Sequence, residues 1–159
     1  MHIILVHPRI PQNAGAVARL AAATNTKLTL VRPLGFRINQ AAVRRAGLDY
    51  WELADVEVAD HLKQAIQSSN NNTYYFSRHA QRSYAQVKYD AECTLVFGSE
   101  DEGLPPEVHA QVSPEHLLRI PIFNPKVRSL NLATSVAIAL YEALRQIHSR
   151  SSISDGDIS

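Results

Sequence analysis

Three short segments carry the side chains with the widest chemical use, and each one follows an apolar run that predicts a strand. They span residues 8–19, 96–105 and 120–131, and they hold amides, guanidinium groups, hydroxyls, carboxylates and glycines. In an open α/β sheet, ligands bind outside the carboxyl ends of the strands. We therefore expect these segments to form a site for a ligand with phosphate or ribose groups.

The first segment leads into a predicted helix, with Asn13 as the expected N-cap. Free N–H groups at such a helix start can hold an anion such as a phosphate. Arg19 follows between one and two turns later, so it need not point at the same ligand. A proline-rich turn with one surface arginine remains the simpler interpretation.

The second segment contains Gly98 and Gly103, which permit tight turns and a close approach of a ligand to the backbone. Between them stand Glu100, Asp101 and Glu102. A helix dipole would account for three acids before a helix start. Hydrogen bonds from ribose hydroxyls are a second interpretation, and a metal site is the least favoured because consecutive side chains point in different directions.

The third segment ends in Arg128, Ser129 and Asn131, which bring a cation, a hydroxyl and an amide to the start of a long predicted helix. Ser129 is the expected N-cap of this helix, and capping alone would explain it. The same three groups suit a phosphate or a nucleotide.

Alternating strand and helix patterns predict a single α/β domain with a mostly parallel sheet flanked by helices. Strands are expected over residues 3–6, 27–31, 56–58, 73–77, 94–97 and 117–120. Helices are expected over residues 14–23, 40–46, 61–68, 105–111 and 130–148. Asn39 and Asp60 are further predicted N-caps, and Gly47 is a predicted helix stop. The domain is expected to span residues 1–148, with a disordered tail over 149–159.

The charge is unevenly distributed although the formal net charge is only +1. Residues 1–48 hold seven Lys and Arg side chains and no acid, whereas residues 100–159 hold eight acids against five bases. An acid-free basic stretch favours a polyanion such as RNA, and a solubilising surface is the alternative.

Several other classes of protein are disfavoured by the sequence. It contains no apolar run of bilayer length, no secretory leader and only one cysteine, Cys93, so we expect a protein of the reducing cytoplasm that does not bind membranes. The dinucleotide, P-loop, paired-ligand zinc and nucleophile-elbow motifs are also missing.

In this order the three segments resemble the motifs of the SPOUT methyltransferase superfamily. The first motif is matched by Pro8, Pro11, Asn13, Gly15 and Arg19, the second by residues 97–105, and the third by Ile120, Pro121 and residues 128–132. Residues 45–50 further resemble the small branch that modifies the wobble ribose of tRNA. The resemblance covers roughly residues 1–148. One departure is the acidic pair Asp101-Glu102, where relatives often carry a basic residue.

The resemblance implies an α/β domain with a deep C-terminal trefoil knot. It implies transfer of a methyl group from S-adenosyl-L-methionine to a ribose 2′-hydroxyl of tRNA, at cytidine or uridine 34, with S-adenosyl-L-homocysteine as product and no metal. The implied cofactor-binding residues are Phe76, Gly98, Glu100, Gly103, Ile120 and Ser129. The implied catalytic residues are Arg19, Asn13, Ser129 and Asn131.

A homodimer that binds tRNA, and not DNA, is also implied, and Arg9, Arg44, Arg45, Arg128 and Tyr141 are the expected RNA-binding residues. Tyr141 shares a face of the last helix with Ile138 and Arg145, which suits a dimer contact or ordinary exposure equally. Arg19 is expected to orient the substrate rather than act as a base, because a guanidinium keeps its proton. The alternatives are an rRNA 2′-O-methyltransferase, a non-catalytic RNA-binding module, and a nucleotide-binding metabolic enzyme.

Overall fold

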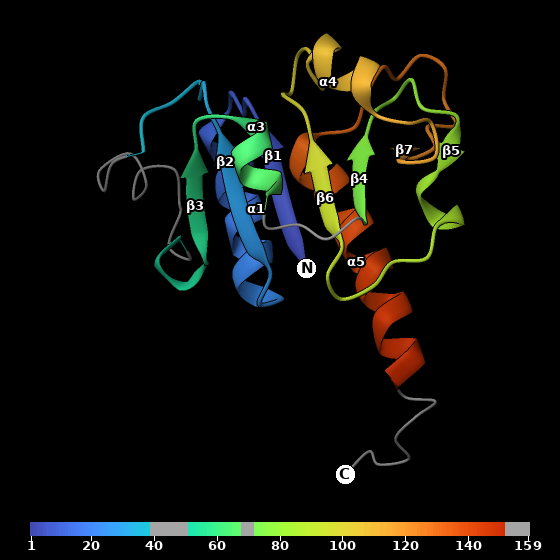
Figure 1. Ribbon diagram of the computed structural model, residues 1–159. Coiled ribbons are helices and arrows are strands. Elements are labelled where there is room, and N and C mark those ends of the chain that lie inside the picture. Colours follow the sequence, from blue (N-terminus) through green and yellow to red (C-terminus); the bar gives the residue numbers. More distant parts are fainter. Residues whose placement is uncertain (39–50, 68–71, 152–159) are drawn as a thin grey trace.

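The computed structural model describes residues 1–38, 51–67 and 72–151, and in this part of the chain seven strands form one sheet (Figure 1). Every pair of neighbouring strands is parallel, and the order is β3-β2-β1-β6-β4-β7-β5. The strands are β1 (His2–Val6), β2 (Lys27–Val31), β3 (Val56–Ala59), β4 (Thr73–Phe76), β5 (Arg82–Ser83), β6 (Thr94–Phe97) and β7 (Leu117–Arg119).

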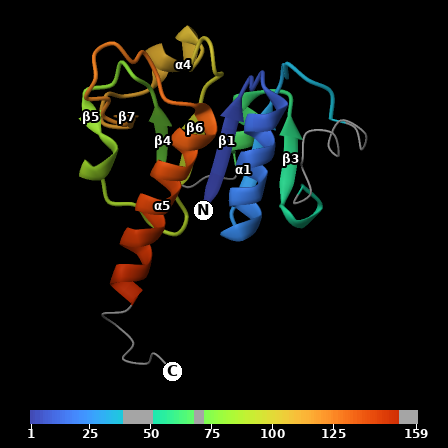
Figure 2. The same ribbon diagram turned by 180° about the vertical axis from the view of Figure 1, so that it is seen from behind.

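Helices cover both faces of this sheet. The helices α1 (Pro11–Ala23) and α5 (Leu132–Ser151) lie together on one face, as Figure 2 shows. The opposite face carries α3 (Leu62–Ile66) and α4 (Pro106–Gln111). Two short 3-10 turns, Trp51–Leu53 and Tyr84–Gln86, complete the described elements.

The residues of β1 show why the inner strands of the sheet are largely apolar. Ile3 and Leu5 belong to the core beneath α1 and α5, whereas Ile4 and Val6 belong to the core on the other face. Alternate side chains of a strand point to opposite faces, so a parallel sheet covered on both sides needs continuous apolar runs. The predicted α/β class and parallel sheet are confirmed, and every predicted strand lies within one residue of the observed one. The two-residue strand β5 was not predicted.

The predicted start of α1 is wrong. The helix begins at Pro11, with Ile10 as N-cap, so Asn13 lies inside the first turn and is buried. Proline suits the first helical position because its fixed φ is already helical and the missing N–H has no partner there. The Asn13 side chain is therefore available for contacts with other segments.

The predicted caps of two other helices are also wrong. Asn131, not Ser129, caps α5, because its Oδ1 accepts a hydrogen bond from the Thr134 N–H at 3.1 Å. His61, not Asp60, is the N-cap of α3. The Asp60 carboxylate instead pairs with Arg32 at 3.3 Å.

The last helix extends further than predicted, since α5 continues to Ser151 and includes the first three residues of the expected tail. Its fully buried positions include Val136, Ala139 and Leu140. Ala137 and Leu144 of the same helix are half-buried. The helix predicted over 40–46, its caps Asn39 and Gly47, and residues 152–159 lie outside the described residues.

Within residues 1–38, 51–67 and 72–151, no helix combines the length and the apolar character needed to cross a bilayer. The trefoil knot implied by the resemblance stays a prediction, because strand order and pairing do not determine threading.

The buried polar pair of His2 and Thr29 joins the neighbouring strands β1 and β2. His2 is 8% exposed, and its Nε2 lies 2.8 Å from the Thr29 hydroxyl. Burial, helped by the charge of Lys27, lowers the pKa of His2 from 6.5 to about 4. The folded chain therefore keeps this imidazole neutral.

We expect His2 to make the folded state sensitive to acid. The unfolded chain binds a proton on His2 near pH 6.5, whereas the folded chain resists it down to about pH 4. Stability contributed by the neutral imidazole is thus complete above pH 6.5 and lost progressively as the pH falls toward 4. In urea unfolding series, the free energy of unfolding of His2→Gln should fall less steeply with decreasing pH than that of the unaltered chain. The difference between the two slopes over this window should be up to about 1.4 kcal/mol per pH unit.

The exposed His148 on α5 provides the matched control for this experiment. The free energy of unfolding of His148→Gln should change with pH in the same way as that of the unaltered chain. If the free energy of unfolding falls with decreasing pH at the same slope for His2→Gln and for the unaltered chain, the proposed role of His2 is contradicted.

Candidate functional site

The carboxyl ends of three neighbouring strands open into one pocket. Its lining includes Phe76 at the end of β4, Gly98 after β6 and Ile120 after β7. These strands are adjacent in the sheet although they are far apart in the sequence. The start of α5 supplies a further wall with Leu132 and Ser135. All six predicted cofactor-binding residues line this pocket, namely Phe76, Gly98, Glu100, Gly103, Ile120 and Ser129.

The pocket combines an apolar interior with polar groups at its edge. The rings of Phe76 and Phe97 stack with centroids 4.4 Å apart and planes 12° from parallel. Ile120 and Leu132 extend this apolar wall, while Ser129 supplies a hydroxyl. Ligand sites of this kind hold a planar apolar group and fix its orientation through a few polar contacts.

A tight turn built on two glycines shapes one side of the pocket. The backbones of Ser99 and Gly103 exchange two hydrogen bonds, each of 3.0 Å. Gly103 has a φ of 74°, which favours glycine. A Cβ on Gly98 would lie 1.9 Å from the Gly103 carbonyl carbon, so only glycine fits there. The turn brings the acidic residues of the second segment to the pocket edge.

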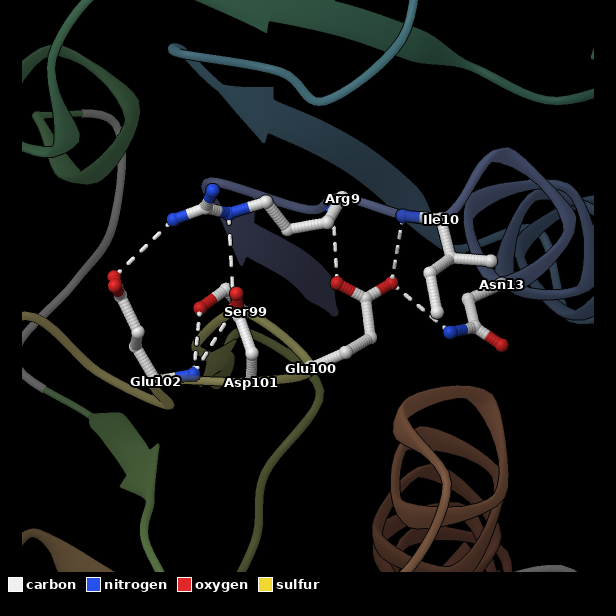
Figure 3. A network of polar contacts seen from close by, with 7 residues as sticks. All are labelled: Arg9, Ile10, Asn13, Ser99, Glu100, Asp101 and Glu102. Atoms are coloured by element: carbon white, nitrogen blue, oxygen red, sulfur yellow. Dashed lines mark hydrogen bonds and ion pairs between the residues drawn. The ribbon is translucent and has the colours of Figure 1, made fainter.

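Glu100 connects the second segment to the first, as Figure 3 shows. One carboxylate oxygen accepts the Arg9 backbone N–H at 2.8 Å. The other accepts the Ile10 N–H at 3.1 Å and the Asn13 side-chain amide at 2.9 Å. Because these donors immediately precede or begin α1, the carboxylate sits where the helix dipole favours a negative charge.

This arrangement corrects one expectation from the sequence. The sequence allowed a ligand anion such as a phosphate at the start of α1, but the protein's own Glu100 carboxylate binds there.

The third segment joins the same network through Asn131. Its side-chain amide donates to Asn13 Oδ1 at 2.9 Å, while its own Oδ1 caps α5. Asn13 thus binds Glu100 on one side and Asn131 on the other. The two predicted catalytic amides therefore act on other protein groups in this structure and hold the three segments together.

The acids that depart from the usual motif are paired. Arg9 lies 3.6 Å from Asp101 and 3.2 Å from Glu102 (Figure 3). A hydrogen bond with the Ser99 side chain, more than the charge of Arg9, lowers the pKa of the Asp101 carboxyl. These groups are exposed, so salt screens their attraction and it contributes little to stability.

The remaining predicted residues do not gather at the pocket. Arg19 is exposed on α1 and is not part of the lining. Arg128 is exposed before α5, and Tyr141 is 53% exposed on α5. Arg44 and Arg45 lie outside the described residues.

Three further side chains line the pocket but were not predicted from the sequence, namely Arg78, His79 and His109. Arg78 and His79 lie two and three residues after the end of β4, so the rule that ligands bind beyond the carboxyl ends of strands would have found them. His109 belongs to α4 and carries no motif. Its Nε2 is buried without a hydrogen-bond partner in the described part of the chain. An orphaned buried polar atom of this kind is typical of a ligand site.

A metal site is not formed by the described residues: no three or more His, Cys, Asp or Glu side chains among them are grouped to hold an ion.

A profile of the SpoU rRNA Methylase family matches residues 1–141. The chain is 43% identical over 150 residues to the tRNA (cytidine(34)-2′-O)-methyltransferase of Acidovorax sp. (strain JS42), with 91% of each chain covered. It is 39% identical over 145 residues to the enzyme of that name from Methylovorus glucosotrophus (strain SIP3-4), covering 91% of this chain and 94% of the relative.

Two solved structures show the same fold. One comes from work on the 2′-OH methylation of C/U34 on tRNA, with 42% identity, a TM-score of 0.84, and coverage of 94% of this chain and 97% of the other. The second is the AdoMet-bound rRNA methyltransferase of Sinorhizobium meliloti, with 26% identity and a TM-score of 0.76. It is matched over 91% of this chain and 55% of its own length.

The Glu100 network leads to a stability prediction. In Glu100→Gln an amide NH₂ replaces one carboxylate oxygen, so in either orientation it faces a backbone N–H donor. Asn13 cannot compensate by flipping its amide, because Asn131 already donates to its oxygen. We expect the free energy of unfolding in urea to fall by about 1–3 kcal/mol.

The exposed Glu107 on α4 gives the matched charge control, and Glu107→Gln should change the free energy of unfolding by less than about 0.5 kcal/mol. Equal stabilities for the two variants would show that Glu100 does not hold the segments together.

Proposed function

The chain belongs to the SpoU methylase family, and we propose that it transfers a methyl group from S-adenosyl-L-methionine to the ribose 2′-hydroxyl of nucleotide 34, a cytidine or uridine, in tRNA. The observation that carries the proposal is the meeting of the three sequence segments at one pocket. Relatives of about 40% identity carry this activity in their names and are covered almost from end to end. The product would be S-adenosyl-L-homocysteine.

The lining of the pocket fits this cofactor. The stacked pair Phe76–Phe97 and Ile120 offer an apolar wall for a purine ring. Ser129 and the unpartnered Nε2 of His109 offer hydrogen-bonding groups to a ligand. The glycine turn at Gly98 and Gly103 keeps the backbone free of side-chain bulk at the pocket edge. When bound, S-adenosyl-L-methionine supplies an electrophilic methyl group on a sulfonium, and this chemistry needs no metal.

The chain's own residues contribute mainly positioning. Methyl transfer requires a ribose oxygen in line with the methyl group, and holding two reactants in that geometry lowers the barrier substantially. Asn13, Asn131 and Glu100 fix the walls within which this happens. Ser129 lines the pocket beside the start of α5 and can hydrogen-bond the ribose or the cofactor.

The RNA would bind over the basic, exposed parts of the chain. Arg128 is exposed beside the pocket, and Arg9 lies at the opposite edge, although Asp101 and Glu102 compete for its guanidinium. Arg44, Arg45 and Tyr141 complete the proposed set.

The proposal includes a homodimer. On the outer side of α5, Tyr141 is 53% exposed and Ile138 half-buried, and an aromatic side chain of this kind suits an interface. Arg145 on the same side is held by Glu142 at 2.8 Å.

A substrate lacking one oxygen atom tests the reaction directly. Two tRNA transcripts identical except for ribose or 2′-deoxyribose at cytidine 34 are incubated with the protein and methyl-labelled S-adenosyl-L-methionine, in the presence of a chelator. We expect label in the ribose transcript alone, and 2′-O-methylcytidine in its digest by mass spectrometry. Equal labelling of both transcripts would contradict methylation of this oxygen. If neither transcript is labelled but rRNA is labelled in a parallel incubation, the rRNA alternative is favoured.

Arg19 provides a test of how the substrate is held. The variant Arg19→Lys keeps the charge but loses the planar fork that binds a phosphate through two hydrogen bonds. We expect kcat/KM for tRNA to fall roughly ten-fold or more, with the affinity for S-adenosyl-L-homocysteine unchanged. Near-normal turnover of the lysine variant would rule out two-point orientation by Arg19.

A further inference from the structure

The segment between β7 and α5 borders the pocket with both of its ends. Ile120 and Ile122 line the pocket at one end, and Ser129 and Leu130 line it at the other. The residues between them, 123–128, are all exposed. In Figure 2 this orange segment runs along the top of the sheet on the side of β4, β7 and β5. The middle of the segment is therefore a rim that stands beside the pocket.

Phe123 is the most conspicuous side chain of this rim. It is 94% exposed, more than any other large hydrophobic residue among those described. Phenylalanine is usually buried, and this ring adds nothing to either core. Its exposure therefore calls for an explanation outside the packing of the fold.

The charge around Phe123 indicates what could cover it. Between Glu115 and Glu142 the chain has no acid, whereas it has three bases, Arg119, Lys126 and Arg128. Lys126 and Arg128 lie on the exposed rim itself. An aromatic face beside cations is the arrangement that binds single-stranded nucleic acid, because the bases stack on the ring while the cations neutralise the phosphates.

We propose that Phe123 stacks on an unpaired RNA base next to the nucleotide whose ribose enters the pocket, while Lys126 and Arg128 contact the adjoining phosphates. This inference rests on the proposed function, since it assigns part of the RNA surface for the same reaction. The rim begins and ends at the pocket lining, so it can reach only nucleotides near the reacting one. Any base can stack on an aromatic ring, so Phe123 would contribute to the affinity for RNA and to the position of the reacting nucleotide more than to selectivity for a base.

Three substitutions separate stacking from simple apolar contact. Phe123→Ala removes the ring, Phe123→Leu keeps an apolar side chain without a π face, and Phe123→Tyr keeps the ring. The matched control is Val127→Ala, because Val127 is an apolar residue of the same rim and is 44% exposed. Both positions, 123 and 127, are on the surface, so the fold should tolerate all four substitutions.

The measurements are the affinity for an anticodon stem–loop RNA, the affinity for S-adenosyl-L-homocysteine, and the association state by sedimentation equilibrium. We expect Phe123→Ala and Phe123→Leu to weaken RNA binding roughly five- to one-hundred-fold. Phe123→Tyr and Val127→Ala should bind RNA within about two-fold of the unaltered chain. Cofactor-product affinity and association state should be the same for all.

Several results would overturn this inference. RNA affinity of Phe123→Ala or Phe123→Leu equal to that of the unaltered chain would exclude stacking. A weakened self-association of Phe123→Ala would instead assign the ring to a contact between two copies of the chain. These outcomes leave the proposed function standing if the unaltered chain methylates tRNA. Failure of the unaltered chain to bind RNA or to transfer methyl groups would overturn the proposed function and this inference together.

Discussion

The carboxylate of Glu100 connects two loops that are about ninety residues apart in the sequence. It accepts hydrogen bonds from the backbone of Arg9 and Ile10 and from the side chain of Asn13. Without the carboxylate these donors would need water or a ligand, because none of them has a partner within α1. Their saturation by an internal carboxylate fixes the start of α1 against the turn that follows β6.

The remainder of the pocket follows from this connection. Asn13 carries the network on to Asn131, which in turn caps α5, so the starts of the two helices on one face of the sheet are held together. Hydrogen bonds in a network reinforce one another when every member is satisfied, and each of these three side chains has identified partners. The walls of the pocket are consequently set by the protein before any ligand binds, which is what positioning catalysis requires.

The two edges of the pocket differ in charge. On one edge, Asp101 and Glu102 are paired with Arg9. On the other, the rim that carries Phe123, Lys126 and Arg128 contains no acid. A polyanion is therefore attracted to the rim rather than to the glycine turn. The exposed ring of Phe123 lies on the same rim.

The sequence by itself determined the fold class, every described strand except β5, and six residues that line one pocket. Continuous apolar runs such as residues 3–6 and 95–97 require burial on both faces, and the exits of parallel strands meet at one edge of the sheet. The motif resemblance implied a shared site for Phe76, Gly98, Glu100, Gly103, Ile120 and Ser129, and all six line one pocket.

Only the tertiary structure decided which groups the polar side chains bind. Asn13 and Ser129 both have the local character of N-caps, yet Pro11 starts α1 earlier and Asn131 caps α5. The anion at the start of α1 proved to be Glu100 and not a ligand. The residue type determines whether a side chain can donate or accept hydrogen bonds. Its actual partner depends on which distant segment the sheet brings within about 3 Å. For the same reason His109, on a helix without any motif, was found only when the fold placed it against the pocket.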